Sequence, residues 1–499
     1  MLSLAKKSPS DITEGPILSN VILFTIPIIL TSVLQRLFNT ADTVVVGRWG
    51  GETEEAREIA LAAVGSCGSL INLILGLFIG LSLGAGVTLA HDVGARDSGG
   101  IEKTLHTSVF TALICGTVVT LIGLPLAPSL LALMKCDPQV LDAAVPYIRA
   151  YFLGVPALTI YTYCASLLRS SGDTTHPLIF LSVSGVINII LNLSTVLIFH
   201  MGALGVGIAT AASQWVSCIL ILLFMLRTDG PCHLDLKKLR INASKLKKIL
   251  MIGLPAGLQS TLFAFSNVIT QSAINSLGKI VVAGNTAAMN LDTYVYNVQN
   301  AFYQTTLTFV GQHVGARKYG RLKRCVLVCA ASVTVTGIVA GVGVYLLGEP
   351  LLNLFAPGND AVISAGMIRL LWVCVPYFLC GLMELATGVE RGLGHSIFPM
   401  LVSLMGACLL RVAWILTVFR AIPALHIVYV SYPITWTITA AVLFIHILFF
   451  FRRLPHPVQA PRVPVANAPR RKAIPRRHAV RRNLSAKHVV IASAPIKTV

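Results

Sequence analysis

The stretch LINLILGLFIGLSLGAGVTLA, residues 70–90, contains no charged side chain and is long enough to cross a bilayer as a helix. A helix needs about 20 apolar residues to span a hydrocarbon core roughly 30 Å thick. Comparable apolar stretches recur from Val21 to Phe451, with short polar breaks between them. They are too long and too continuously apolar for the alternating strands of a membrane β-barrel, so the pattern predicts transmembrane helices.

Eleven polar breaks divide these stretches into twelve predicted transmembrane helices. No segment between them is long enough for a soluble domain, so the predicted fold class is an all-α polytopic membrane protein. The breaks lie near residues 47–59, 91–103, 135–142, 172–176, 200–202, 227–248, 278–279, 311–324, 348–361, 391–396 and 420–423.

Composition and charge support a membrane protein. The chain of 499 residues is 55% hydrophobic and only 12% charged, whereas soluble domains are about 25% charged. The net charge of +19 is concentrated in alternate loops and in the tail, which is the positive-inside pattern and not a nucleic-acid surface. We therefore expect a multi-pass protein of the inner (plasma) membrane with both termini cytoplasmic. The eleven cysteines show no metal-ligand spacing, and we interpret them as small apolar residues.

Two copies of a six-helix unit are visible in the sequence. Val-Gly-Ala-Arg follows the second predicted helix at residues 93–96 and the eighth at residues 314–317, and Arg169, Gly172 and Pro177 recur as Arg391, Gly394 and Pro399. Because six is an even number, both copies enter the membrane from the same side, which predicts a parallel repeat with a central cleft. We expect the arginines of these elements to anchor at lipid headgroups and the glycines to allow tight reversals. Glycines 76, 80 and 84 predict a close helix-packing face.

The repeat predicts the domain organisation. A cytoplasmic N-terminal segment, residues 1–16, precedes an N-terminal six-helix bundle, residues 17–227. A basic cytoplasmic linker, residues 228–247, leads to a C-terminal six-helix bundle, residues 248–454. The tail, residues 455–499, is basic and contains too few apolar residues for a core, so we expect it to be disordered.

The chain resembles the multidrug and toxic compound extrusion (MATE) family over roughly residues 15–454. The resemblance rests on the order of several short strings within the six-plus-six layout. It implies efflux of organic, often cationic and amphipathic compounds, driven by protons or sodium, without a cofactor. The strings are Thr13-Glu14-Gly15-Pro16, Asn39-Thr40-Ala41-Asp42-Thr43 with Gly47, the two Val-Gly-Ala-Arg elements, Leu168-Arg169 with Gly172-Asp173-Thr174, and Gly253-Leu254-Pro255-Ala256-Gly257.

Ionisable residues within predicted helices are costly and are functional candidates. Asp42, Asn192 and Thr210 lie at similar depth in the outer half of their helices, with Asn188 one turn from Asn192. A carboxylate surrounded by amide and hydroxyl oxygens can hold sodium, which would make these four residues the metal ligands, or can carry a proton instead. The resemblance implies that this is the cation site of the N-terminal bundle, although some family members have aspartate at the position of Asn192.

The C-terminal bundle supplies the predicted substrate contacts. An acid with aromatic faces suits a bulky organic cation, while interhelical hydrogen bonding is the alternative role for the same side chains. Arg369 and Arg411 are expected to anchor near helix ends. The predicted substrate-binding residues are Gln259, Asn290, Asp292, Tyr296, Gln299 and Glu384.

Two other functions are compatible with a polytopic membrane protein. The main alternative is a flippase for a lipid-linked saccharide, which shares the wider superfamily fold but commonly has a strongly basic cavity. The sequence contains no HExxH motif, nucleophile elbow or phosphate-binding loop, so we do not expect an enzyme. The expected partners are small organic cations or drugs and the lipid bilayer, not nucleic acid, and the expected state is a monomer.

Overall fold

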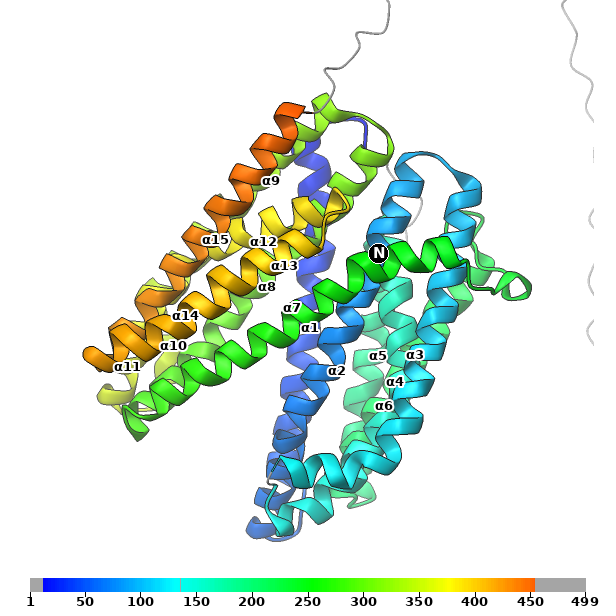
Figure 1. Ribbon diagram of the computed structural model, residues 1–499. Helices are drawn as coiled ribbons and strands as arrows, with labels where there is room; N and C mark the ends of the chain where they lie inside the picture. The colour runs from blue at the N-terminus through cyan, green and yellow to red at the C-terminus, as the bar shows by residue number, and fades with distance from the viewer. Residues whose placement is uncertain (1–11, 135, 454–499) are drawn as a thin grey trace, which may run out of the picture. The chain divides into compact units, whose positions relative to one another are not determined.

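The computed structural model describes residues 12–134 and 136–453, and these residues form helices with no strand (Figure 1). In the first half of the chain, the described residues form six long helices, called here the N-terminal bundle. Its elements are α1 (Ile17–Trp49), α2 (Glu54–Gly94), α3 (Ser98–Leu133), α4 (Pro138–Ser170), α5 (Thr175–Leu193) with a π-helical end (Ser194–Ile198), and α6 (Gly202–Arg227).

The second half, called here the C-terminal bundle, repeats this arrangement with more interruptions. A short 3₁₀ turn, Leu236–Lys238, lies in the connection before it. Its elements are α7 (Ala243–Asn275), α8 (Lys279–Gly315), α9 (Tyr319–Leu346), α10 (Gly348–Asn353), α11 (Asp360–Arg369), a π-helical segment (Leu370–Cys374), α12 (Tyr377–Gly392), α13 (Ile397–Ser403), a π-helical segment (Leu404–Leu409), α14 (Leu410–Trp414), a π-helical segment (Ile415–Phe419), and α15 (Leu425–Arg453).

The number of membrane-length elements agrees with the prediction of twelve. Within the described residues, ten helices are long and apolar enough to cross a membrane, and the bent pair Asp360–Cys374 and Tyr377–Gly392 adds an eleventh. The twelfth is α8, which has 37 residues and is less apolar than the others because it carries many amide and hydroxyl side chains. The predicted breaks coincide with the helix ends to within a few residues.

The repeated glycine and arginine elements end helices in two different ways. Gly172 and Gly394 adopt φ values of 105° and 96°, which only glycine tolerates easily, so the predicted tight reversal after α4 and α12 is confirmed. In the Val-Gly-Ala-Arg elements the left-handed residues are Arg96 and Arg317, with φ of 55° and 53°, and not the glycines. The expectation of a glycine reversal was therefore wrong there.

Equivalent helices occupy the centre of each bundle. Helix α4 packs against α2, α3 and α6, and its counterpart α12 packs against α8, α9 and α15. Helix α1 belongs to both cores, because Phe24 packs edge-on against Phe309 of α8 at 5.3 Å between ring centroids, whereas Val46 lies in the core of the N-terminal bundle. The coupling of the two bundles through α1 is reinforced by a 2.9 Å hydrogen bond between the Thr25 and Thr305 hydroxyls.

The glycine steps of α2 form a packing face, as predicted. A β-carbon at Gly80 would collide with the backbone of Gly257 in α7, and one at Gly84 would collide with the backbone of Gly253. These contacts let α2 and α7 approach backbone to backbone, so a side chain at these positions would force the helices apart. All eleven cysteines are free thiols, nine of them buried, in agreement with their predicted role as small apolar residues.

Candidate functional site

The predicted cation site assembles around Asp42 of α1. The side-chain nitrogen of Asn192 in α5 donates to Oδ1 of Asp42, and it also lies 3.2 Å from Oδ1 of Asn188, one turn earlier on the same helix. Asn188 in turn donates to the Ser213 hydroxyl of α6 at 3.4 Å. Three of the four predicted residues are therefore joined by hydrogen bonds that cross from α1 through α5 to α6.

Thr210 takes part only through its backbone. Its carbonyl accepts a 2.8 Å hydrogen bond from the Ser213 hydroxyl, while its own hydroxyl makes no hydrogen bond with Asp42, Asn188 or Asn192. The hydroxyl bonded to the cluster is thus that of Ser213, which sequence reasoning missed. Ser213 lies nearly one turn beyond Thr210 on α6, and depth along the helix could not distinguish the two.

One oxygen of this cluster lacks a hydrogen-bond donor. Oδ1 of Asn192 is buried and has no hydrogen-bond partner among residues 12–134 and 136–453, and Asn192 as a whole is only 1% exposed. A buried carbonyl-type oxygen without a donor is costly, and a cation next to it would remove that cost. The donor set of one carboxylate and amide oxygens fits sodium, and Asp42 alone could instead hold a proton.

Asp292, the acid predicted to attract cationic cargo, is already neutralised. Arg369 donates from Nε and Nη2 to the same Asp292 oxygen, at 2.9 and 2.7 Å, and both residues are at most 6% exposed. Nη1 of Arg369 donates to Asn285 of α8, which also accepts from the Tyr429 hydroxyl. The expectation that Arg369 anchors near a helix end was wrong, because its guanidinium is buried inside the bundle, where Asp292 compensates its charge.

Arg411 is a second correction. It is 2% exposed, its guanidinium lies 4.0 Å from the centre of the Tyr432 ring, and Nη2 donates to Thr435 at 3.2 Å. A cation–π contact and one hydroxyl hold it inside the bundle, instead of the lipid headgroups that were expected.

Gln259 binds an arginine of the repeat. Its side-chain oxygen accepts a 2.8 Å hydrogen bond from Arg391, which also donates to the Tyr303 hydroxyl. Arg391 is 4% exposed, so its expected headgroup role was wrong. Its repeat partner Arg169 donates to Gln304 of α8 at 2.7 Å and links the two bundles.

The remaining predicted substrate residues divide into two groups. Gln299 is fully buried against α9, and Asn290 donates to the Thr286 carbonyl on its own helix. Tyr296 is 36% exposed, and Glu384 is half-buried without a hydrogen bond or ion pair to another described residue. Within this set, Tyr296 is thus the exposed aromatic group, and Glu384 is the acid that Arg369 does not neutralise.

A carboxylate that sequence reasoning missed lies at the end of α12. Glu390 is fully buried and accepts from Nδ1 of His446 at 2.6 Å and from Nδ1 of His395 at 3.3 Å. The hydrogen bond to Glu390 raises the pKa of His395, which lies between α12 and α13, above its usual value. The available signal was Glu390 itself, because an acid at the end of an apolar stretch requires a partner.

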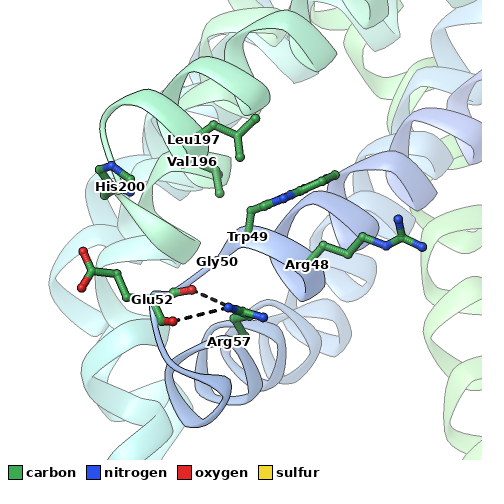
Figure 2. Close-up of a pocket in the computed structure, with 9 residues that line it drawn as sticks. Arg48, Trp49, Gly50, Glu52, Arg57, Val196, Leu197 and His200 are labelled. Carbon is green, nitrogen blue, oxygen red and sulfur yellow. Dashed lines mark hydrogen bonds between the residues drawn. The ribbon is translucent and has the colours of Figure 1, made fainter.

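A cavity of 330 Å³ opens where α1 and the π-helical end of α5 meet (Figure 2). Arg57 does not point into free space there, since it donates to the Gly51 and Glu52 carbonyls at 3.0 and 3.4 Å. Val196 lines the cavity four positions after Asn192, about one helical turn along the chain, whereas Asp42, Asn188 and Asn192 themselves are not lining residues. The other lining residues are Arg48, Trp49, Gly50, Leu197 and His200.

Two homologous bundles of membrane-length helices, with polar clusters inside each, define a polytopic membrane transporter. The family model MatE matches residues 27–194 and 255–416, once in each bundle. The chain therefore belongs to the MatE family, and the resemblance stated from the sequence is confirmed.

Relatives and solved structures agree with this assignment. The chain is 25% identical over 443 residues to the probable multidrug resistance protein YoeA of Bacillus subtilis, covering 86% of this chain and 93% of that one. It is 21% identical to the multidrug export protein MepA of Staphylococcus aureus, covering 84% and 94%. A solved outward-facing multidrug resistance MATE transporter superposes with a TM-score of 0.83 at 20% identity, covering 90% and 99%, and shows the fold.

Proposed function

We propose that the protein exports organic, cationic amphipathic compounds across the plasma membrane in exchange for protons or sodium, by alternating access. The observation that carries the proposal is the cluster of Asp42, Asn188 and Asn192, which places one acid among amide oxygens with an unpartnered Asn192 oxygen. A carboxylate in such surroundings can bind a cation in one state and release it in another.

The coupling ion reaches Asp42 through the cavity at the end of the N-terminal bundle in this proposal. Val196 lines that cavity one turn from Asn192, and α5 leads from the cavity to the cluster. On the cargo side, Glu384 and Tyr296 replace Asp292 as the acid and aromatic contacts, because Asp292 is already paired with Arg369.

The names of the relatives support drug export over a saccharide flippase. YoeA is described as a probable multidrug resistance protein and MepA as a multidrug export protein. We extend that role to this chain and place both termini in the cytoplasm, with the protein working as a monomer. No cofactor takes part besides the coupling ion.

The test is gradient-driven efflux from vesicles that contain the purified protein and an organic cation, with sodium and proton gradients imposed separately. Asp42→Asn keeps the size of the side chain and removes its charge, so it should insert normally and lose gradient-driven export. Asp142→Asn, an exposed acid at the start of α4, is the matched control and should export normally. Normal coupled export by Asp42→Asn would refute the assignment of Asp42.

A further inference from the structure

Two hydrogen bonds cross between the bundles at one end of the molecule. Nε2 of His91, near the end of α2, lies 2.7 Å from the carbonyl oxygen of Gly392 at the end of α12. Nε2 of Gln312, near the end of α8, donates at 2.8 Å to the carbonyl oxygen of Ser170 at the end of α4. A carbonyl oxygen only accepts, so the His91 nitrogen is the donor in the first bond.

These two bonds are equivalent under the internal repeat. His91 precedes Val93 by two positions, as Gln312 precedes Val314 in the second Val-Gly-Ala-Arg element. The acceptors are equivalent as well, because each directly follows the arginine of an Arg-x-x-Gly element. The acceptors are Ser170, after Arg169, and Gly392, after Arg391. Each bundle therefore donates one bond to the other, from the same structural position.

The backbones of α2 and α8 are also in contact next to these two hydrogen bonds, and the contact is again equivalent in the two bundles. A β-carbon at Gly94 would collide with the carbonyl group of Gln312, and a β-carbon at Gly315 would collide with the carbonyl group of His91. Helices α2 and α8 thus cross at their two glycines, with one donor side chain on either side of the crossing. Since no other residue fits at the crossing, glycine is required there for close approach rather than for backbone freedom.

We propose that His91 and Gln312 are a reciprocal pair of positioning residues that hold the two bundles closed at this end. The carbonyl groups at the ends of α4 and α12 have no further helical turn to donate to them, so they are free to accept from the opposite bundle. Separation of the bundles breaks both bonds together, because the two are related by the repeat axis. This inference rests on the proposed alternating-access function and assigns the closed end to the face that carries the basic loops.

The substitution that distinguishes this role is His91→Gln. Glutamine already makes the equivalent bond at position 312, so it should restore the bond at position 91, whereas His91→Ala cannot form it. Thr159→Ala is the matched control, because the Thr159 hydroxyl is buried and bonds to the Ala112 carbonyl within the N-terminal bundle alone.

The experiment measures the distance between the bundles at this end by double electron–electron resonance between two spin labels. Spin labels are attached to unnatural amino acids at positions 103 and 324, where exposed Lys103 and Arg324 lie near the starts of α3 and α9, so that the eleven native thiols do not react. His91→Ala or Gln312→Ala should raise the ratio of the long-distance to the short-distance population about fivefold, and the double variant up to about 30-fold.

His91→Gln and Thr159→Ala should keep the parent distribution. An unchanged distribution in the double alanine variant would overturn the proposal, and so would an equal shift in His91→Gln and His91→Ala, which would indicate packing alone. The distance is measured without cargo or an ion gradient. Failure of the Asp42 assignment would therefore leave this result intact, and failure of the His91 and Gln312 assignment would leave the efflux test of Asp42 unaffected.

Discussion

The side-chain nitrogen of Asn192 in α5 donates a hydrogen bond to the carboxylate of Asp42 in α1, while the side-chain oxygen of Asn192 is buried without a donor in the described part of the chain. This hydrogen bond joins two helices that are far apart in sequence. It places the acidic group of Asp42 beside the Asn192 side chain, whose oxygen has no donor among residues 12–134 and 136–453. A cation bound there would contact both residues, so the two side chains should affect ion coupling in different ways.

Asn192→Ala should distinguish the two coupling ions. If the ion is sodium, the loss of one oxygen ligand should raise the sodium concentration for half-maximal transport by about two- to tenfold, the effect of losing one polar contact. If the ion is a proton, the same change should mainly move the pH dependence of transport. Vesicle efflux at varied sodium and pH measures both. Thr43→Ala, which removes an exposed hydroxyl of α1, is the control, and an unchanged response in Asn192→Ala would exclude Asn192 from the site.

Asp292→Asn should mainly lower the stability of the folded protein and should not selectively reduce the export of cationic compounds. Removing the acid leaves the Arg369 guanidinium buried without compensation, which costs about 3–5 kcal/mol. Thermal unfolding in detergent should show a clear loss, and export of cationic and neutral compounds should fall together. The double variant Asp292→Asn, Arg369→Gln should recover most of the stability. A stable Asp292→Asn protein that loses only cation export would instead show that Asp292 contacts cargo.

Stability should depend on pH through His395. Its pKa is raised by the hydrogen bond to Glu390, so the folded state binds the proton more tightly than the unfolded state. The resulting stabilisation is complete below the unfolded value of about 6.5 and is lost as the pH rises through the higher folded value. The groups that face His395 are Glu390 and His446, with the Phe450 ring alongside.

Thermal unfolding at about pH 6 and about pH 8.5 measures this effect. The parent protein should lose stability between the two conditions, and His395→Gln should lose less. His426→Gln, an exposed histidine of α15, is the control and should behave like the parent. An identical pH response in His395→Gln and the parent would contradict the role of His395.

The connection between the bundles should be cytoplasmic. Asn242 caps α7 by accepting from the Lys245 amide at 3.1 Å, so the exposed neighbour Ser244 is the better position for a probe. Ser244→Cys should not react with a membrane-impermeant thiol reagent added to intact cells, and it should react after the membrane is made permeable. The parent protein, with its native cysteines, gives the background. Ready labelling in intact cells would reverse the proposed topology.

The sequence by itself determined the number of helices, their ends and the internal repeat. These features follow from the length of apolar stretches and from the polar breaks between them, which are local properties of the chain. The cluster of Asp42, Asn188 and Asn192 was also predictable, because depth along a helix can be counted from its ends. Thr210 and Ser213 lie less than one helical turn apart on α6, and counting could not choose between them.

Only the tertiary structure decided which charged groups are available. Asp292 and Arg369 are 77 positions apart and belong to different helices, yet two hydrogen bonds join them and cancel the charge that was expected to attract cargo. The reciprocal bonds of His91 and Gln312 likewise depend on how the ends of four helices meet. Counting from the ends of a helix gives the depth of a residue in the membrane, but the rotation of each helix about its axis, and hence the partners of each side chain, is set by packing against its neighbours.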